Sequence, residues 1–302
     1  MFLPPGFYQR SIVTKLGRMV YQTADPSFWL PELDEKADAL SALVFLHGFG
    51  GGSSAYEWSK VFPAFATDYR ILAPDLIGWG QSDHPARRYQ VDDYISTIIE
   101  FLEQTCTEPV PVIASSLTAA IVIRAAIARP ELFQCLILST PAGLSDFGEN
   151  YTRSLFAQIV KVPILDRLIY STGVATREGV STFLEQRQFA QPNRIYPEIV
   201  QAYLESARQP NAEYAALSFV GGDLCFDLSL YMPQLATPTA IYWGKGSQFT
   251  SPEVGQRLAD LNPQAVKAFQ ILDDTGLTPH LELPAVTIGV IRRYLKQLTQ
   301  PD

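Results

Sequence analysis

A serine between a strand and a helix is the first candidate for covalent chemistry. The segment PVPVIASSLTAAIVIRAAIARPELF places an apolar strand directly before an apolar helical stretch, with no loop between them. A serine at such a junction lies on a strained turn at a helix N-terminus, where its hydroxyl is exposed and the next N–H can bind an oxyanion. The spacing selects Ser116 as the candidate nucleophile and Leu117 as the N–H donor. The alternative is that Ser115 and Ser116 only cap the helix.

A second segment offers backbone donors. In LVFLHGFGGGSSAYEW an apolar strand ends at His47-Gly48-Phe49 and continues into a run of glycines. Glycine lets the backbone approach a ligand closely and direct N–H groups toward it, and such groups can hold a developing oxyanion. A glycine-rich loop is weak evidence by itself, so its value depends on the elements around it.

These candidate residues would be positioned by alternating strands and helices. Apolar runs such as SALVFLHG, PVPVIASS, CLILSTP and TAIYWG alternate with helical patterns, one of them over residues 91–103. This alternation is typical of a parallel sheet with helices on both faces. It stops at residues 145–231, which we predict to be a helical cap inserted into a core of residues 1–144 and 232–302. The apolar faces of the cap either only pack on the core or also line an apolar cleft.

The order of the motifs resembles that of the cap-bearing α/β-hydrolase superfamily. HGFGG, DLIGWGQSD, the strand–serine–helix junction, YWGKGS and GLTPHLELP follow one another over about residues 10–298. The resemblance implies an α/β fold with a mostly parallel eight-stranded sheet, helices on both faces and an inserted helical cap. It also implies that Ser116 is the nucleophile and that the N–H groups of Phe49 and Leu117 form the oxyanion hole.

The chain departs from the family pattern at the residues that would activate the serine. The family elbow G-x-S-x-G reads A-S-S-L-T at residues 114–118, and the β-branched Thr118 should tighten or distort the turn. Ser247 stands where the family acid follows W-G-x-x, and Leu277 stands where G-H-x-x-H-x-E has its base. A serine hydroxyl is a poor nucleophile without a base, whose help contributes roughly 10²- to 10⁴-fold in rate. The changes therefore predict weak activity or none.

Two residues are candidate substitutes for the missing partners. His280 lies three residues beyond the position of the usual base, in the same loop, and could act as an unusual base or have a structural role. Asp146 follows the strand CLILSTP and is the candidate acid. The other two histidines, His47 and His84, are expected to be structural and exposed, respectively.

Two classes of function remain open. In the first, the protein is a non-catalytic relative that binds a hydrophobic small molecule or a protein partner. The simultaneous change at base, acid and both elbow flanks favours this class, and Leu277 would make the pocket more apolar. In the second, Ser116 cleaves an ester, thioester or amide with an apolar group, using an unusual base such as His280. Lyase or cofactor-free oxygenase chemistry is less favoured, since it also tends to need the absent histidine.

Composition excludes several other classes of function. The net charge of −8 and a pI near 5.0 argue against nucleic-acid binding and against electrostatic docking on anionic lipid. Three scattered cysteines and three histidines make no metal-ligand pattern, and no dinucleotide fingerprint is present, so we expect no metal and no cofactor. We find neither a secretory signal nor a membrane-spanning run, and expect a cytoplasmic protein.

Overall fold

The central element of the fold is one eight-stranded sheet. The computed structural model describes residues 2–30, 40–148 and 170–299 of the 302-residue chain. The strand order is β1-β2-β4-β3-β5-β6-β7-β8. β3 to β8 are parallel, whereas β1 and β2 form a hairpin that joins β4 in antiparallel fashion. The predicted mostly parallel eight-stranded α/β architecture is confirmed.

The elements alternate along the chain as the apolar runs predict. The strands are β1 (Phe7–Thr14), β2 (Gly17–Ala24), β3 (Ala42–Leu46), β4 (Arg70–Pro74), β5 (Val110–Ser115), β6 (Phe133–Ser139), β7 (Thr239–Gly244) and β8 (Val266–Leu272). The α-helices are α1 (Pro26–Trp29), α2 (Val91–Thr105), α3 (Ser116–Ala128), α6 (Arg177–Phe183), α7 (Pro197–Ala207), α8 (Ala212–Val220), α9 (Pro252–Asp260), α10 (Pro279–Glu282) and α11 (Pro284–Thr299).

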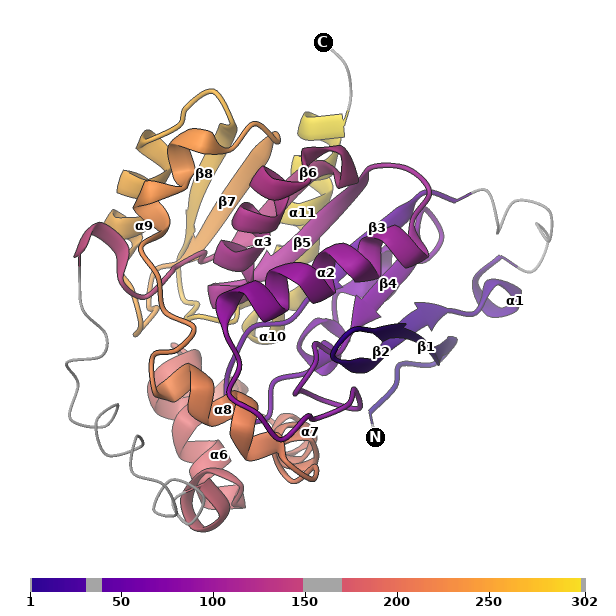
Figure 1. Ribbon diagram of the computed structural model, residues 1–302, viewed down its shortest axis with the longest axis vertical. Coiled ribbons are helices and arrows are strands. Elements are labelled where there is room, and N and C mark those ends of the chain that lie inside the picture. The colour runs from indigo at the N-terminus through magenta and orange to yellow at the C-terminus, as the bar shows by residue number, and fades with distance from the viewer. Residues whose placement is uncertain (1, 31–39, 149–169, 300–302) are drawn as a thin grey trace.

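Two apolar layers cover the two faces of the sheet. Successive side chains of a strand point to opposite faces, so in β3 Val44 and Leu46 pack with α2 and α3 in one buried cluster. Leu43 and Phe45 pack with α11 in a second cluster on the other face. Figure 1 shows α2 and α3 in front of the strands and α11 behind them. Strands covered on both faces explain why these runs are apolar throughout.

The parallel strands bring the candidate residues to one edge of the sheet. The carboxyl ends of parallel strands lie at the same edge, where α/β folds bind their ligands. Phe49, Ser116, Asp146, Ser247 and Leu277 come from the segments that follow β3, β5, β6, β7 and β8, respectively. The fold therefore gathers all these positions at one end of the molecule.

Helices between β6 and β7 lie beyond this edge. α6, α7 and α8 group together past one end of the strands in Figure 1. α7 is joined to the core by Ser206, whose hydroxyl accepts from the Gly80 N–H and donates to the Ser53 carbonyl, each at 3.1 Å. Residues 149–169, which hold most of the apolar run SLFAQIVKVPILDRLIY, lie outside the described residues. The cap boundaries at residues 145 and 231 stay a prediction.

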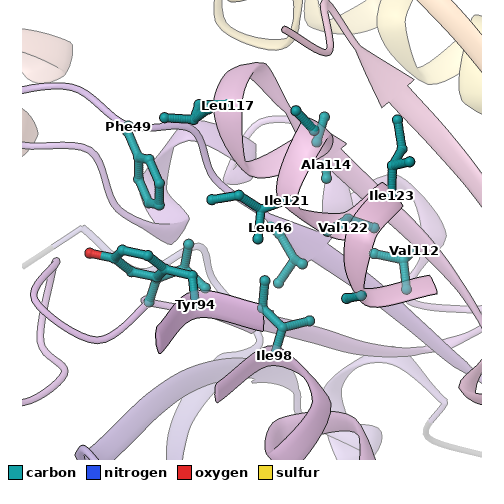
Figure 2. Close-up of a cluster of buried hydrophobic side chains, with 14 of the residues drawn as sticks. Leu46, Phe49, Tyr94, Ile98, Val112, Ala114, Leu117, Ile121, Val122 and Ile123 are labelled. Atoms are coloured by element: carbon teal, nitrogen blue, oxygen red, sulfur yellow. The ribbon is translucent and has the colours of Figure 1, made fainter. Parts of the chain in front are cut away.

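The helix that carries Ser116 packs on the sheet through side chains that are mostly buried. Ile121 of α3 is fully buried and packs near Leu46 (Figure 2). We expect Ile121→Ala to lower the free energy of unfolding by about 2–5 kcal/mol, because it leaves a cavity between α3 and the sheet. The exposed Gln297 of α11 gives a matched truncation, Gln297→Ala, that should change it by less than about 0.5 kcal/mol. Urea unfolding measures both, and equal effects would contradict this packing.

Candidate active site

The junction between β5 and α3 holds Ser116 in a left-handed backbone. Ser115 ends the strand, Ser116 begins the helix, and the φ of Ser116 is 57°. This region costs a non-glycine residue roughly 1–2 kcal/mol. Ser116 is partly exposed, whereas Ser115 and Thr118 are buried. The side chain of Ser115 makes no capping hydrogen bond to the helix.

The loop after β3 packs directly against this junction. A Cβ at Gly48 would lie 3.3 Å from both Ser115 Oγ and Ser116 Cβ, closer than ordinary contact, so the position suits glycine. The Phe49 ring points into the core and stacks on Trp79 at 5.2 Å between centroids. Figure 2 shows this ring beside Leu117 and next to Tyr94. Among the described residues neither the Phe49 N–H nor the Leu117 N–H has an acceptor, which leaves both free for a ligand oxygen.

Gly48 is hydrogen-bonded through both its backbone N–H and its backbone carbonyl. Its N–H donates to Glu57 Oε2 at 2.8 Å, and its carbonyl lies 2.7 Å from Nδ1 of His47. The Leu76 N–H donates to Nε2 of His47 at 3.0 Å, so the proton of a neutral imidazole is on Nδ1 and is donated to the Gly48 carbonyl. His47 is structural, as expected. The Phe49 N–H shares a planar trans peptide with that carbonyl and must point the opposite way.

Glu57 is a buried carboxylate that the sequence analysis did not single out. It is 1% exposed. Burial by itself would raise its pKa, but the nearby His280 and His47 imidazoles and the Ser53 hydroxyl outweigh burial and lower the pKa to about 2. The Tyr203 hydroxyl of α7 lies 2.8 Å from Glu57 Oε1 and 2.8 Å from Gln188 Oε1. A hydroxyl has one proton to donate, and the anionic carboxylate is the stronger acceptor.

His280 lies beside Glu57 and is fully buried. Its ring stacks on Trp58 with 4.0 Å between centroids, and its Nε2 is 3.9 Å from Glu57 Oε2, beyond hydrogen-bond distance. Neither ring nitrogen has a hydrogen-bond partner among the described residues. Burial lowers the pKa of His280, so the imidazole is neutral at pH 7.

None of the three histidines hydrogen-bonds to Ser116. His47 is held by Gly48 and Leu76, and the partly buried His84 contacts the Gly80 carbonyl at 3.1 Å. His280 packs on Trp58 as described above. Within the part of the chain that the structure describes, the Ser116 hydroxyl has no hydrogen-bond partner.

The remaining predicted residues lie in the loops after the last three strands. The Asp146 carboxylate accepts from the Gly143 N–H at 3.0 Å and from the Leu228 N–H at 2.9 Å, and burial raises its pKa to about 6. It therefore ties the segment after β6 to the segment that returns toward β7. The carboxylate beside His280 is instead Glu57, so the role of Asp146 as the acid stays a prediction.

Ser247 and Leu277 occupy neighbouring loops. The loops after β7 and β8 are joined by the Gly246 N–H, which donates to the Thr275 carbonyl at 2.9 Å. Leu277 is 3% exposed, and its N–H donates to the Gln188 carbonyl at 2.7 Å. Leu277 thus has a buried apolar side chain, and its backbone is hydrogen-bonded to Gln188, between α6 and α7.

The described residues contain no group of three or more His, Cys, Asp or Glu side chains placed to hold a metal ion. In that part of the chain, no helix is both long and apolar enough to cross a membrane.

A family model described as the alpha/beta hydrolase fold matches residues 41–282. Epoxide hydrolase 4 of Mus musculus is 25% identical over 280 residues, which are 86% of this chain and 74% of that protein. The strigolactone esterase RMS3 of Pisum sativum is 38% identical over 115 residues, which are 36% of this chain and only 42% of the esterase. A solved esterase from Thermogutta terrifontis superposes with a TM-score of 0.72 at 18% identity, covering 97% of this chain and 100% of that one.

The left-handed backbone at Ser116 predicts the relative stability of two variants. Ser116→Gly removes the Cβ that makes φ = 57° unfavourable, whereas Ser116→Ala keeps it. We expect the glycine variant to be more stable than the alanine variant by about 1 kcal/mol. At an ordinary helical position alanine would be favoured by about 1 kcal/mol, so the sign of the difference in urea unfolding is diagnostic, and greater stability of the alanine variant would refute the geometry.

The raised pKa of Asp146 predicts a pH-dependent stability. The folded state keeps the Asp146 proton up to about pH 6, whereas the unfolded chain releases it near the ordinary value of 3.8. Its contribution to stability is therefore fully present below about pH 4 and is lost as the pH rises through 6. Between pH 4 and 7, we expect Asp146→Asn to gain on the order of 2–3 kcal/mol in unfolding free energy relative to the unaltered protein. A stability difference between Asp146→Asn and the unaltered protein that does not vary with pH would contradict the raised pKa of Asp146.

Proposed function

The chain belongs to the alpha/beta hydrolase fold family, and from this premise we propose that it is a binding protein or at best a feeble enzyme. Its proposed ligand is an apolar small molecule that carries a carbonyl oxygen. The carrying observation is that no histidine hydrogen-bonds to Ser116. Without a proton acceptor the hydroxyl forgoes a rate advantage of roughly 10²- to 10⁴-fold.

The free donors of the site support the carbonyl part of the ligand. The Phe49 and Leu117 N–H groups come from two elements that meet at Gly48 and Ser116, and neither has an acceptor among the described residues. Two such donors can bind a neutral carbonyl oxygen as well as an oxyanion. Binding the oxygen needs no base, so the loss of a proton acceptor does not remove this capacity.

The apolar surroundings support the rest of the ligand. Leu277, a buried apolar residue, stands where the family has a polar base. Burying apolar surface contributes roughly 25 cal/mol per Å². The printed names of the relatives, a strigolactone esterase and an epoxide hydrolase among them, point to small organic substrates of those proteins. Recognition of a protein partner stays a prediction.

A second candidate function rests on the backbone of Ser116. A partly exposed serine held at φ = 57° is the arrangement expected of a nucleophile, and it favours a serine hydrolase that cleaves an ester, thioester or amide with an apolar group. In this alternative His280 would have to leave Trp58 and reach the serine.

Hydrolysis of p-nitrophenyl butyrate tests the proposal. We expect the turnover rate of the unaltered protein to lie within about threefold of that of Ser116→Ala, because general-base help is missing. The double substitution Ser247→Asp with Leu277→His restores the family residues and should raise Ser116-dependent turnover at least about tenfold.

A fluorophosphonate probe separates the two candidate functions. Ser116 should stay largely unlabelled in the folded protein and become labelled in the double variant. Rapid labelling of the unaltered protein, lost in Ser116→Ala together with fast ester turnover, would establish the hydrolase instead.

Binding of acetophenone at least about fivefold tighter than binding of ethylbenzene, which lacks the carbonyl, is the expected positive result. Equal affinity for the two would oppose the carbonyl site.

A further inference from the structure

The buried carboxylate of Glu57 connects α7 to the loop after β3, which carries the Phe49 N–H. Glu57 and Tyr203 are each 1% exposed, and the Tyr203 hydroxyl donates to Glu57 Oε1 at 2.8 Å. The other oxygen, Oε2, accepts from the Gly48 N–H at 2.8 Å. The two oxygens of one side chain thus contact two segments, α7 and the loop after β3.

The bond to Gly48 has a geometric consequence for Phe49. The Gly48 N–H is fixed by Glu57, and the Gly48 carbonyl is fixed by His47 at 2.7 Å. The His47 bond holds the peptide that joins Gly48 to Phe49, and the Glu57 bond holds the preceding peptide, so rotation about Gly48 is restricted from both sides. The direction of the Phe49 N–H follows from the plane of the peptide that joins the two residues. Release of Glu57 would free one of the two restraints.

Burying the charge of Glu57 in this connection is energetically costly. Burial removes several kcal/mol of hydration free energy from an ionised carboxylate. If one hydrogen-bond partner is then removed, the charge is poorly compensated. Tyr203 is therefore a partner that Glu57 cannot lose without changing its position or its protonation. A second tyrosine–glutamate contact between the core and α7, from the Tyr56 hydroxyl to Glu198 Oε1 at 2.8 Å, does not involve Gly48.

We propose that Glu57 is a positioning residue through which Tyr203 of α7 sets the direction of the Phe49 N–H. A movement of α7 then changes the orientation of this donor, and ordering of the donor by a bound carbonyl holds α7 in place. The significance for ligand binding rests on the proposed function, but the connection itself is a property of the ligand-free protein.

Backbone amide NMR of the ligand-free protein tests the connection. We expect Tyr203→Phe to accelerate hydrogen exchange of the Gly48 amide at least tenfold, beyond any acceleration that the variant's lower global stability causes. The Phe49 amide resonance should also shift. Tyr56→Phe is the matched control, because it removes a hydrogen bond of the same type and length to the same helix. It should leave both amides within twofold of their original exchange rates. Unchanged Gly48 and Phe49 amides in Tyr203→Phe, or equal changes in Tyr56→Phe, would overturn the proposal.

A second variant and a ligand pair complete the test. If Tyr203→Phe does not fold, Glu57→Gln is used, which keeps the size of the side chain but removes the charge. The same tenfold acceleration at Gly48 is expected, and its absence overturns the connection.

In binding assays, Tyr203→Phe should weaken the binding of acetophenone at least fivefold and the binding of ethylbenzene less than twofold. Equal weakening would contradict a role in orienting the Phe49 N–H. If the unaltered protein binds neither compound, the proposed function fails while the amide measurements still decide the connection.

Discussion

The direct passage from strand to helix at Ser116 is the constraint around which the site is built. With no loop between β5 and α3, the chain reverses direction only by placing this serine at φ = 57°. The sharp turn brings the loop after β3 so close that a Cβ at Gly48 would meet Ser115 Oγ and Ser116 Cβ at 3.3 Å. It also leaves the first N–H groups of α3 without intrahelical partners, as at every helix start. The buried Thr118, which replaces the family glycine, is accommodated without loss of the left-handed turn.

The charge of Glu57 acts differently on a bound carbonyl and on an oxyanion. A Cβ at Gly48 would lie 3.6 Å from Glu57 Oε2 and 3.3 Å from Ser116 Cβ, so the carboxylate is close to any group held at the serine. Like charges repel inside a protein, and at an effective dielectric constant of 20 the repulsion still amounts to about 2 kcal/mol at a separation of about 7 Å. A neutral carbonyl carries no net charge and escapes most of this repulsion. The same residue that orients a donor therefore opposes the negative intermediate of acyl transfer.

The architecture and the serine were predictable because their signals are local in the sequence. Runs of apolar residues define the buried strands, and the absence of a loop before Ser116 defines the turn. Glu57 gave no such signal, because it lies in the aromatic run AYEW with no second polar residue at a telling spacing. Its partner Tyr203 is 146 residues away, so only the tertiary fold brings the two together. Asp146 was selected by its place after β6, but its hydrogen bonds to backbone N–H groups depend on where the returning segment lies.

The energetic cost of moving His280 opposes its recruitment as a base. To reach Ser116, His280 would have to leave its stack on Trp58, and its loop would have to move. That loop is held by the Leu277 N–H, which donates to Gln188, and by Glu282, which accepts from the N–H groups of Ala190, Gln191 and Gly276. Four such bonds contribute about 1 kcal/mol each, and the stack adds about 1 kcal/mol more. A general base would lower the barrier by about 3–5 kcal/mol. Because the cost is about as large as the gain, recruitment of His280 gives no net advantage.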